Sequence, residues 1–349
     1  SAGVLILSYY SVIAGWTITY IPKAFLGEFI GTDAISISKL FDDFVANPVS
    51  VILAHTIFMA INYFIIASGV KGLEKAVRFL MPGLLLLLFI LFIYSLTSGS
   101  FMDGVKFMFT PNFNALNWDG VLTAMGLACF TLSIGMGAIM AYGAYLPQET
   151  SITNATVSVV IADTGIAMLA GLVIFPLVFA NGLNPGEGPD LVFKTLPLVF
   201  GQMQVGTFLA TIFFVLLSFA ALTSALGLME PAVAWMVEST EYNRKQCAAT
   251  IASIIWFLGL GTALSFNTMA DFKFLNGTIY ENVDFLTSNI MLPLGAVFTT
   301  FFAAWIMSKN STSEELGGHG VTYRIWRFLA KYFSPIAILV IFLQAIGWI

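Results

Sequence analysis

The sequence predicts an all-α integral membrane protein with nine transmembrane helices. Of its 349 residues, 58% are hydrophobic and only 9% are charged, and 33 are Phe. A water-soluble protein of this length could not bury so much apolar surface, because part of every globular protein faces solvent. The apolar residues also run in long stretches of the length that a membrane-spanning helix needs. They do not show the short alternating segments of a membrane β-barrel.

The nine apolar stretches follow one another along the whole chain and are separated by polar or Gly- and Pro-rich connections. They cover residues 1–27, 50–70, 78–98, 121–146, 152–180, 205–237, 247–266, 285–308 and 325–348. Pro48 is placed to begin the second helix, since Pro is tolerated in a first turn. A basic loop at 70–75 leads into the third helix.

The polar connections are informative at 28–49, 99–120 and 181–204. The first two are outer loops by their position between the predicted helices. The third carries strong turn chemistry at 184–189 and a short amphipathic helix at 190–201. It is therefore either a lid over an outer opening or an ordinary ordered connection.

The distribution of Lys and Arg predicts the orientation of the chain. Nine basic residues fall on one side, namely Lys71, Lys75, Arg78, Arg244, Lys245, Lys309, Arg324, Arg327 and Lys331. The other side holds five, namely Lys23, Lys39, Lys106, Lys194 and Lys273. The richer side is cytoplasmic by the positive-inside rule, so the C-terminus is predicted to face outward. Ser1 opens almost directly into an apolar run without a Met or a basic flank, and we expect that preceding residues are absent and that the chain is a fragment.

Three groups of polar residues stand inside the apolar stretches. Thr131 and Ser133 precede Gly135-x-Gly137 near the middle of the fourth helix. Glycine holds a helix poorly, and hydroxyls offer other partners to backbone groups that a break sets free. The segment is therefore either an unwound break whose carbonyls can bind a cation, or a stripe of small residues for close helix packing.

Asp163 lies well inside the fifth stretch, where a charge costs at least about 2.5–3.5 kcal/mol. It is either an ion ligand or a neutral acid bonded to a neighbouring helix. In the sixth stretch, Ala220, Thr223 and Ser224 share one helical face. Two hydroxyls and a carbonyl there supply half of an oxygen cage for a small cation, although such hydroxyls often bond back to their own helix.

Enzymatic chemistry is disfavoured by the same sequence. It shows no Ser-His-Asp, Cys-His or HExxH arrangement, and Cys129 and Cys247 have no metal or disulfide spacing. We therefore expect a protein that is not an enzyme and has no organic cofactor. The net charge of −5 is weak, and we expect no nucleic-acid partner.

Several motifs occur in an order that is more specific than any one of them. They are Tyr9-Tyr10 with Trp16; Gly72-Leu73-Glu74-Lys75 followed by Met81-Pro82; Phe109-Thr110-Pro111-Asn112-Phe113; Phe130 to Gly137 with Tyr142 and Tyr145; and Ala220 to Ser224 with Glu230-Pro231. Together, over residues 1–349, the chain resembles the neurotransmitter:sodium symporter family, particularly its eleven-helix bacterial amino-acid transporters.

The resemblance implies an incomplete inverted-repeat fold, five helices plus five, with a final helix after the repeats. The nine predicted helices would be the family's third to eleventh, so its first two would be missing. Residues 1–100 would then be the remainder of the first repeat. Residues 121–309 would form the second repeat, with 181–204 as its outer lid loop, and 322–349 would form the final helix.

The resemblance also implies residue roles around a substrate site. Tyr10 would contact the substrate carboxylate, while Ser133 and the carbonyl of Phe130 would hold its ammonium. The substrate-binding set is Ile6, Tyr10, Phe130, Thr131, Ser133, Met136, Ser224 and Leu228. Phe130 would close the site toward the outside, and Asp284 would be an outer gate that pairs with an arginine of the missing first helix.

Two sodium sites follow from the same resemblance. Thr131 and Asp163 match ligands of the first, and Ala220 (through its carbonyl), Thr223 and Ser224 match the second. Asp163 stands where Asn is common. Chloride-dependent relatives have a polar amide in place of Leu127 and a serine in place of Ala167, so Asp163 is expected to supply the charge that chloride provides elsewhere.

The sequence therefore predicts a sodium-coupled symporter that imports neutral, hydrophobic amino acids by alternating access. Met136 stands where some relatives have Phe, and its adaptable side chain is expected to admit larger or more varied substrates. The expected partners are the amino acid, sodium and the lipid of a bacterial inner (plasma) membrane, which the chain crosses many times. The alternatives are a transport-silent amino-acid receptor and another sodium-solute symporter of the same fold.

Overall fold

A computed structural model describes residues 2–114, 116–183, 188–275, 277–318 and 320–348 of the chain. In these residues the regular structure is helical, apart from one isolated bridge between Phe274 and Gly277. The predicted all-α class is confirmed. Residues 184–187 of the predicted turn, and Ser1, lie outside the described residues.

Eight uninterrupted helical segments in the described part are long and apolar enough to cross a membrane. Six are single helices: α1 Ala2–Phe25, α3 Pro48–Ala67, α4 Val70–Leu96, α8 Ile152–Ala180, α11 Gly206–Ser239 and α12 Arg244–Ser265. Two are helices with π-helical stretches: α13 Ile279–Phe285, η2 Leu286–Met291, α14 Leu292–Phe301 and η3 Phe302–Ile306 in one, and α16 Val321–Phe328, η4 Leu329–Phe333 and α17 Ser334–Ala345 in the other.

The remaining predicted helix, 121–146, is divided into α6 Trp118–Thr131 and α7 Ala138–Ala144. The predicted loop at 70–75 is wrong, because these residues form the first turns of α4. Gly69, with φ 87°, makes the turn after α3 on its own, so a longer loop is not needed. Short helices occupy the connections: α2 Ala34–Ala46, α5 Phe101–Phe109, α9 Gly188–Asp190, η1 Leu191–Thr195, α10 Leu196–Gly201 and α15 Lys309–Glu315.

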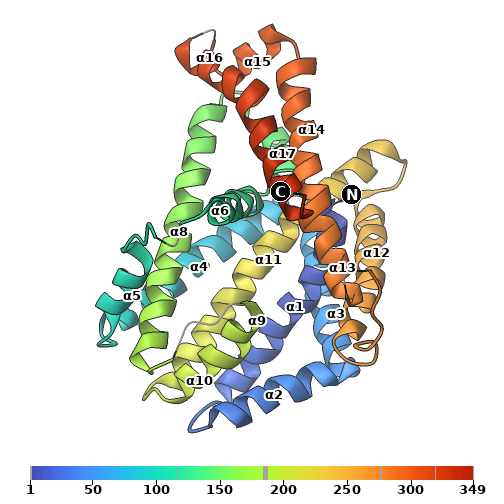
Figure 1. Ribbon diagram of the computed structural model, residues 1–349. Helices are drawn as coiled ribbons and strands as arrows, with labels where there is room; N and C mark the ends of the chain where they lie inside the picture. The colour runs from blue at the N-terminus through green and yellow to red at the C-terminus, as the bar shows by residue number, and fades with distance from the viewer. Residues whose placement is uncertain (1, 115, 184–187, 276, 319, 349) are drawn as a thin grey trace.

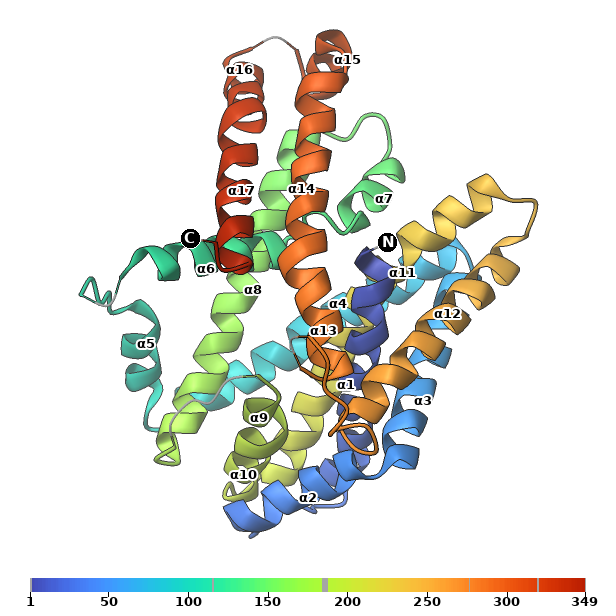
Figure 2. The ribbon, with the colours of Figure 1, turned by 45° about the vertical axis from the view of Figure 1, so that its right-hand side comes forward.

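Helix α1 runs through the most densely packed part of the molecule, against α3, α11 and α12 (Figures 1 and 2). Its side chain Trp16 is 1% exposed and meets Phe41, Phe193 and Phe266 edge-on. Aromatic pairs of this kind contribute beyond the area that they bury. They join α1 to α2, η1 and the end of α12.

Glycines let the backbones of this core approach one another closely. A Cβ on Gly15 of α1 would lie 2.7 Å from the carbonyl of Ala54 in α3. A Cβ on Gly259 of α12 would lie 2.5 Å from His55 Nε2 and 2.8 Å from the carbonyl oxygen of Ser8. Small residues at such contacts are typical of membrane helix packing, in which apolar surface alone gives helices no preference for one another over lipid.

Two of the three predicted outer connections, 28–49 with α2 and 181–204 with α9 and α10, lie together at one end of the helices, and α15 and α16 lie at the opposite end (Figure 1). The connection 99–120, with α5, lies at the side of the molecule beside α8. Lys194 of η1 forms ion pairs with Asp42 of α2 and Asp190, both at 3.2 Å, and its Nζ lies over the ring of Phe41. Partial burial alone would lower the pKa of Lys194, but the two carboxylates outweigh it and raise the pKa. These contacts bind η1 to α2.

The contact at Gly15 gives a direct test of this packing. We expect Gly15→Ala to destabilise the protein by about 1–3 kcal/mol, the range for overpacking a dense core, because its Cβ would press on the backbone of Ala54 rather than on a movable side chain. Thermal unfolding in detergent measures this. Gly261→Ala is the matched control, since its Cβ would meet only the side chain of Ile279 at 3.3 Å; equal melting temperatures for the two variants would contradict the packing.

Candidate functional site

The break between α6 and α7 is the centre of the candidate site. Residues 132–137 leave the helix, and three of them have left-handed backbone: Ser133 with φ 55°, Gly135 with φ 85° and Gly137 with φ 88°. Only glycine adopts this conformation without cost, so Ser133 is held there against its preference. The carbonyl of Phe130 accepts the N–H of Ser133 at 3.0 Å and keeps a second lone pair for another donor.

The glycines of the break also pack closely against α14. A Cβ on Gly135 would lie 2.5 Å from the carbonyl oxygen of Leu292, and one on Gly295 would lie 2.7 Å from the carbonyl oxygen of Gly135. The sequence offered an unwound break and small-residue packing as alternatives. The structure has both, because the same glycine that permits the turn also permits the contact.

A cavity of about 850 Å³ opens beside this break. Its walls come from α1, α4, the α6–α7 segment, α8 and α11. Ten predicted site residues line it: Ile6, Tyr10, Phe130, Thr131, Ser133, Met136, Asp163, Thr223, Ser224 and Leu228. Ala220 and Asp284 do not. The volume lies within the range of small-molecule sites, and side chains from five separate segments reach one space.

The cavity has both polar and apolar walls. Ile6, Met136 and Leu228 are nearly fully buried apolar side chains. Tyr10 of α1 and Ser224 of α11 bring hydroxyls to the same cavity from two helices that pack against each other. Phe130 is 42% exposed, so its ring can contact a bound molecule.

On α11 the hydroxyl of Thr223 donates to the carbonyl of Ala220 at 2.8 Å. This is the back-bonding that the sequence left open as the alternative to cation binding. The bond does not close the site to a cation, since the hydroxyl oxygen keeps its lone pairs after donating its proton. Ser224, one residue on, is exposed to the cavity.

Asp163 of α8 is half-buried and shares the cavity with Thr131. In the described residues no ion pair involves Asp163. The hydroxyl of Thr131 donates weakly to the carbonyl of Ala128, at 3.4 Å. A carboxylate and a hydroxyl at the mouth of a helix break are hard oxygen ligands of the kind that alkali and alkaline-earth cations prefer.

Asp284 lies apart from the cavity, on α13, and is half-buried. Its Oδ1 accepts the hydroxyl of Ser288 at 3.0 Å. One turn along, Thr287 and Tyr9 place their hydroxyls 3.5 Å apart. Asp284 therefore belongs to a polar contact between α1 and the α13–η2 helix, and its role as a gate stays a prediction.

Sequence reasoning used Glu230 only as part of a motif and missed its contacts. Its side chain is completely buried in α11, receives Arg244 Nη2 at 2.5 Å and accepts the hydroxyl of Tyr145 at 2.6 Å. Arg244 Nε also donates to the carbonyl of Ile66 at 3.0 Å. The group ties the end of α7 to α3, α11 and α12. Its sequence signal, an acid inside an apolar run, is the one that singled out Asp163.

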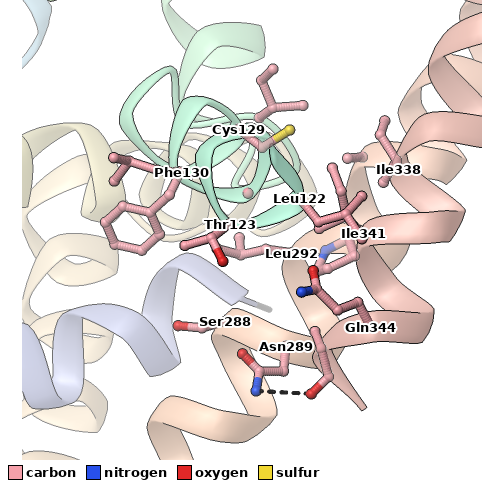
Figure 3. Close-up of a pocket in the computed structure, with 16 residues that line it drawn as sticks. Leu122, Thr123, Cys129, Phe130, Ser288, Asn289, Leu292, Ile338, Ile341 and Gln344 are labelled. Atoms are coloured by element: carbon pink, nitrogen blue, oxygen red, sulfur yellow. Dashed lines mark hydrogen bonds between the residues drawn. The ribbon is translucent and has the colours of Figure 1, made fainter. Parts of the chain in front are cut away.

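A second cavity, of about 500 Å³, lies between α6, the α13–α14 helix and α17 (Figure 3). Cys129, Thr123 and Leu122 enter it from α6, and Ile341 and Gln344 from α17. Asn289 donates its amide to the carbonyl of Ala345 at 3.4 Å, and Gln344 donates to Asp119 at 3.3 Å, which join the final helix to its neighbours. Phe130 lines both cavities, and its role as a lid stays a prediction.

Comparison of the sequence with known proteins identifies the family to which it is similar. The sequence model of the sodium:neurotransmitter symporter family matches residues 26–348. The sodium-dependent transporter YhdH of Bacillus subtilis is 37% identical over 98% of this chain and 77% of its own length. A sodium-dependent transporter of Haemophilus influenzae is 32% identical over 97% of this chain and 76% of its own length.

A solved structure of another protein has the same fold. The crystal structure of MhsT in complex with L-phenylalanine superposes with a TM-score of 0.89 at 40% sequence identity. The match covers 99% of this chain and 79% of that one.

The geometry of the break predicts the result of adding one methyl group. We expect Gly135→Ala to abolish ligand binding and to lower stability by at least about 1–3 kcal/mol, the cost of a residue held in sparsely populated backbone, because its Cβ would also collide with the Leu292 carbonyl. Thermal unfolding with and without amino acid measures both effects. Gly126→Ala, in regular α6 with its Cβ 3.7 Å from Ile341, is the control, and a Gly135→Ala protein that binds like Gly126→Ala would rule out the role given to the break.

Proposed function

Since the chain belongs to the sodium:neurotransmitter symporter family, we propose that it imports neutral, hydrophobic amino acids with sodium across the bacterial inner membrane. The observation that carries the proposal is the cavity at the helix break, where ten residues with expected roles line one space of about 850 Å³. The protein is a multi-pass membrane transporter by its family and its apolar helices; its substrate is what we propose.

The amino-acid ends would be held at the break. The carbonyl end of α6 carries partial negative charge from the helix dipole, which suits an ammonium near the Phe130 carbonyl and Ser133. Tyr10 would donate its hydroxyl to the carboxylate. Both polar ends would then be held by hydrogen bonds that replace those lost with water.

The side chain of the substrate would lie against Ile6, Met136 and Leu228, which are buried and apolar. Met136 is unbranched and adapts to different shapes, so we propose that the pocket accepts aliphatic and aromatic side chains. That MhsT holds L-phenylalanine supports a pocket of sufficient size in a protein of the same fold.

Two sodium ions would bind, each at its own site near the break. Thr131 and Asp163 would supply a hydroxyl and a carboxylate to one ion, and the Ala220 carbonyl with the Thr223 and Ser224 hydroxyls would supply oxygens to another. Coupling then follows from linkage, since each ligand raises the affinity of the other by the same factor. Closure of Phe130 over the substrate, with Asp284 as the outer gate, would commit the loaded form to open inward.

Uptake of labelled amino acid into proteoliposomes tests the second sodium site. We expect sodium-driven accumulation by the full-length protein. In Thr223→Ala the sodium concentration for half-maximal uptake should rise about tenfold, which corresponds to about 1.4 kcal/mol, because one oxygen of the cage is lost. Thr211→Ala is the matched control, since Thr211 bonds back to Thr207 on the same helix at 2.6 Å outside the cavity. Binding without accumulation would instead indicate a receptor, and sodium-independent uptake would overturn the coupling.

The charge of Asp163 gives a prediction about chloride. We expect uptake to be unchanged when chloride is replaced by gluconate, because Asp163 supplies the negative charge beside the sodium ion. Asp163→Asn should lose most of its uptake, whereas Asp190→Asn, in the outer loop, should keep it. The same transport assay in two salts measures this, and a clear loss of wild-type uptake in gluconate would refute the assignment.

A further inference from the structure

A cavity of about 640 Å³ lies at the outer end of the molecule, where α1, α2 and α3 meet. It is separate from the substrate cavity and shares no lining residue with it. Lys23 of α1 and Lys39 and Asp43 of α2 enter it, and Leu53 and Ile57 of α3 form its apolar wall. Nothing in the proposed transport cycle uses these groups.

The cavity is built by an amphipathic helix held across the ends of two others. Asp33 caps α2 by accepting the N–H of Ser36 at 2.9 Å. Asn47 caps α3. One face of α2 is buried through Phe41 and Phe44, and this fixes the helix so that its polar residues stand over the outer end of α3.

The charges of the cavity are of both signs. Lys23 is paired with Glu28 at 3.3 Å, whereas in the described part of the chain no ion pair involves Lys39 or Asp43. Lys39 and Asp43 are four residues apart on α2 and therefore lie on the same side of that helix. The cavity thus offers one unpaired ammonium and one unpaired carboxylate, beside a second ammonium that is already paired.

The apolar wall of the cavity lies on a side of α3 that we expect to contact lipid. Leu53 is 57% exposed and Ile57 is 42% exposed on α3, a segment apolar enough to cross a membrane. Large apolar side chains exposed on such a helix contact lipid acyl chains. The charged groups stand at the end of this wall, where we expect the lipid headgroups to lie.

We propose that this cavity binds a zwitterionic phospholipid with a primary ammonium, of the phosphatidylethanolamine type. The phosphate would bind Lys39, with Lys23 beside it, and the headgroup ammonium would donate to Asp43. The acyl chains would run along Leu53 and Ile57. Phosphatidylglycerol has no cation for Asp43, and the choline headgroup has no N–H to donate, so the charge pattern favours ethanolamine over both.

Native mass spectrometry of the full-length protein in detergent, titrated with the three lipids carrying identical acyl chains, tests this. We expect phosphatidylethanolamine to bind most tightly. Lys39→Ala should weaken binding of all three lipids about tenfold, the effect of losing one charged hydrogen bond. Asp43→Asn should weaken phosphatidylethanolamine alone and so remove the preference among headgroups.

Lys273→Ala and Asp271→Asn remove the same charges from another outer loop and should bind lipid like the unaltered protein. Thermal unfolding of each variant checks that it is folded. Unchanged binding in Lys39→Ala would overturn the site, as would phosphatidylglycerol or phosphatidylcholine binding as tightly as phosphatidylethanolamine. Neither readout depends on transport, so failure here is distinct from failure of the proposed function.

Discussion

The structure depends on one constraint, that a backbone in lipid must satisfy its own hydrogen bonds. Helices meet this constraint along most of the chain, because the backbone groups in a helix interior find their partners within the same segment. Among the described residues, the break at 132–137 interrupts one of the predicted spanning helices. Residues of the break line the cavity and pack against the backbone of α14, and irregular backbone is tolerated in a membrane where it lines a cavity or is buried in protein.

The helices around the break are held together by close packing of their backbones. α1, α3, α11 and α12 approach closely because Gly15 and Gly259 leave room for the neighbouring backbone. The buried Glu230 then ties α7 to this scaffold through Tyr145 and Arg244. A buried ion pair adds little net stability, but removing one partner is costly because it leaves the other charge unpaired. The pair therefore specifies where α7 sits more than it stabilises the fold.

The candidate site combines two kinds of oxygen that come from different places in the fold. Side-chain oxygens reach the cavity from the regular helices α1, α8 and α11, and backbone oxygens become free only where α6 ends. Hydroxyls on regular helices can already take part in hydrogen bonds within the helix, as the bond from Thr223 to the carbonyl of Ala220 shows. The helix break thus adds partners that a straight helix could not offer, and it does so next to side chains that lie on rigid elements.

The sequence by itself determined the membrane class, the positions of the spanning helices and the residue types in the site, because hydropathy and glycine placement act locally. It placed Thr131, Asp163 and Thr223 on the helices that carry them. It could not decide between a break and close packing at Gly135, since that depends on Leu292 and Gly295 more than 150 residues away. The sequence also could not show that Arg244 contacts Glu230, or that Lys39 and Asp43 lie at the end of α3. These contacts join separate helices, and only tertiary packing fixes which faces of separate helices meet.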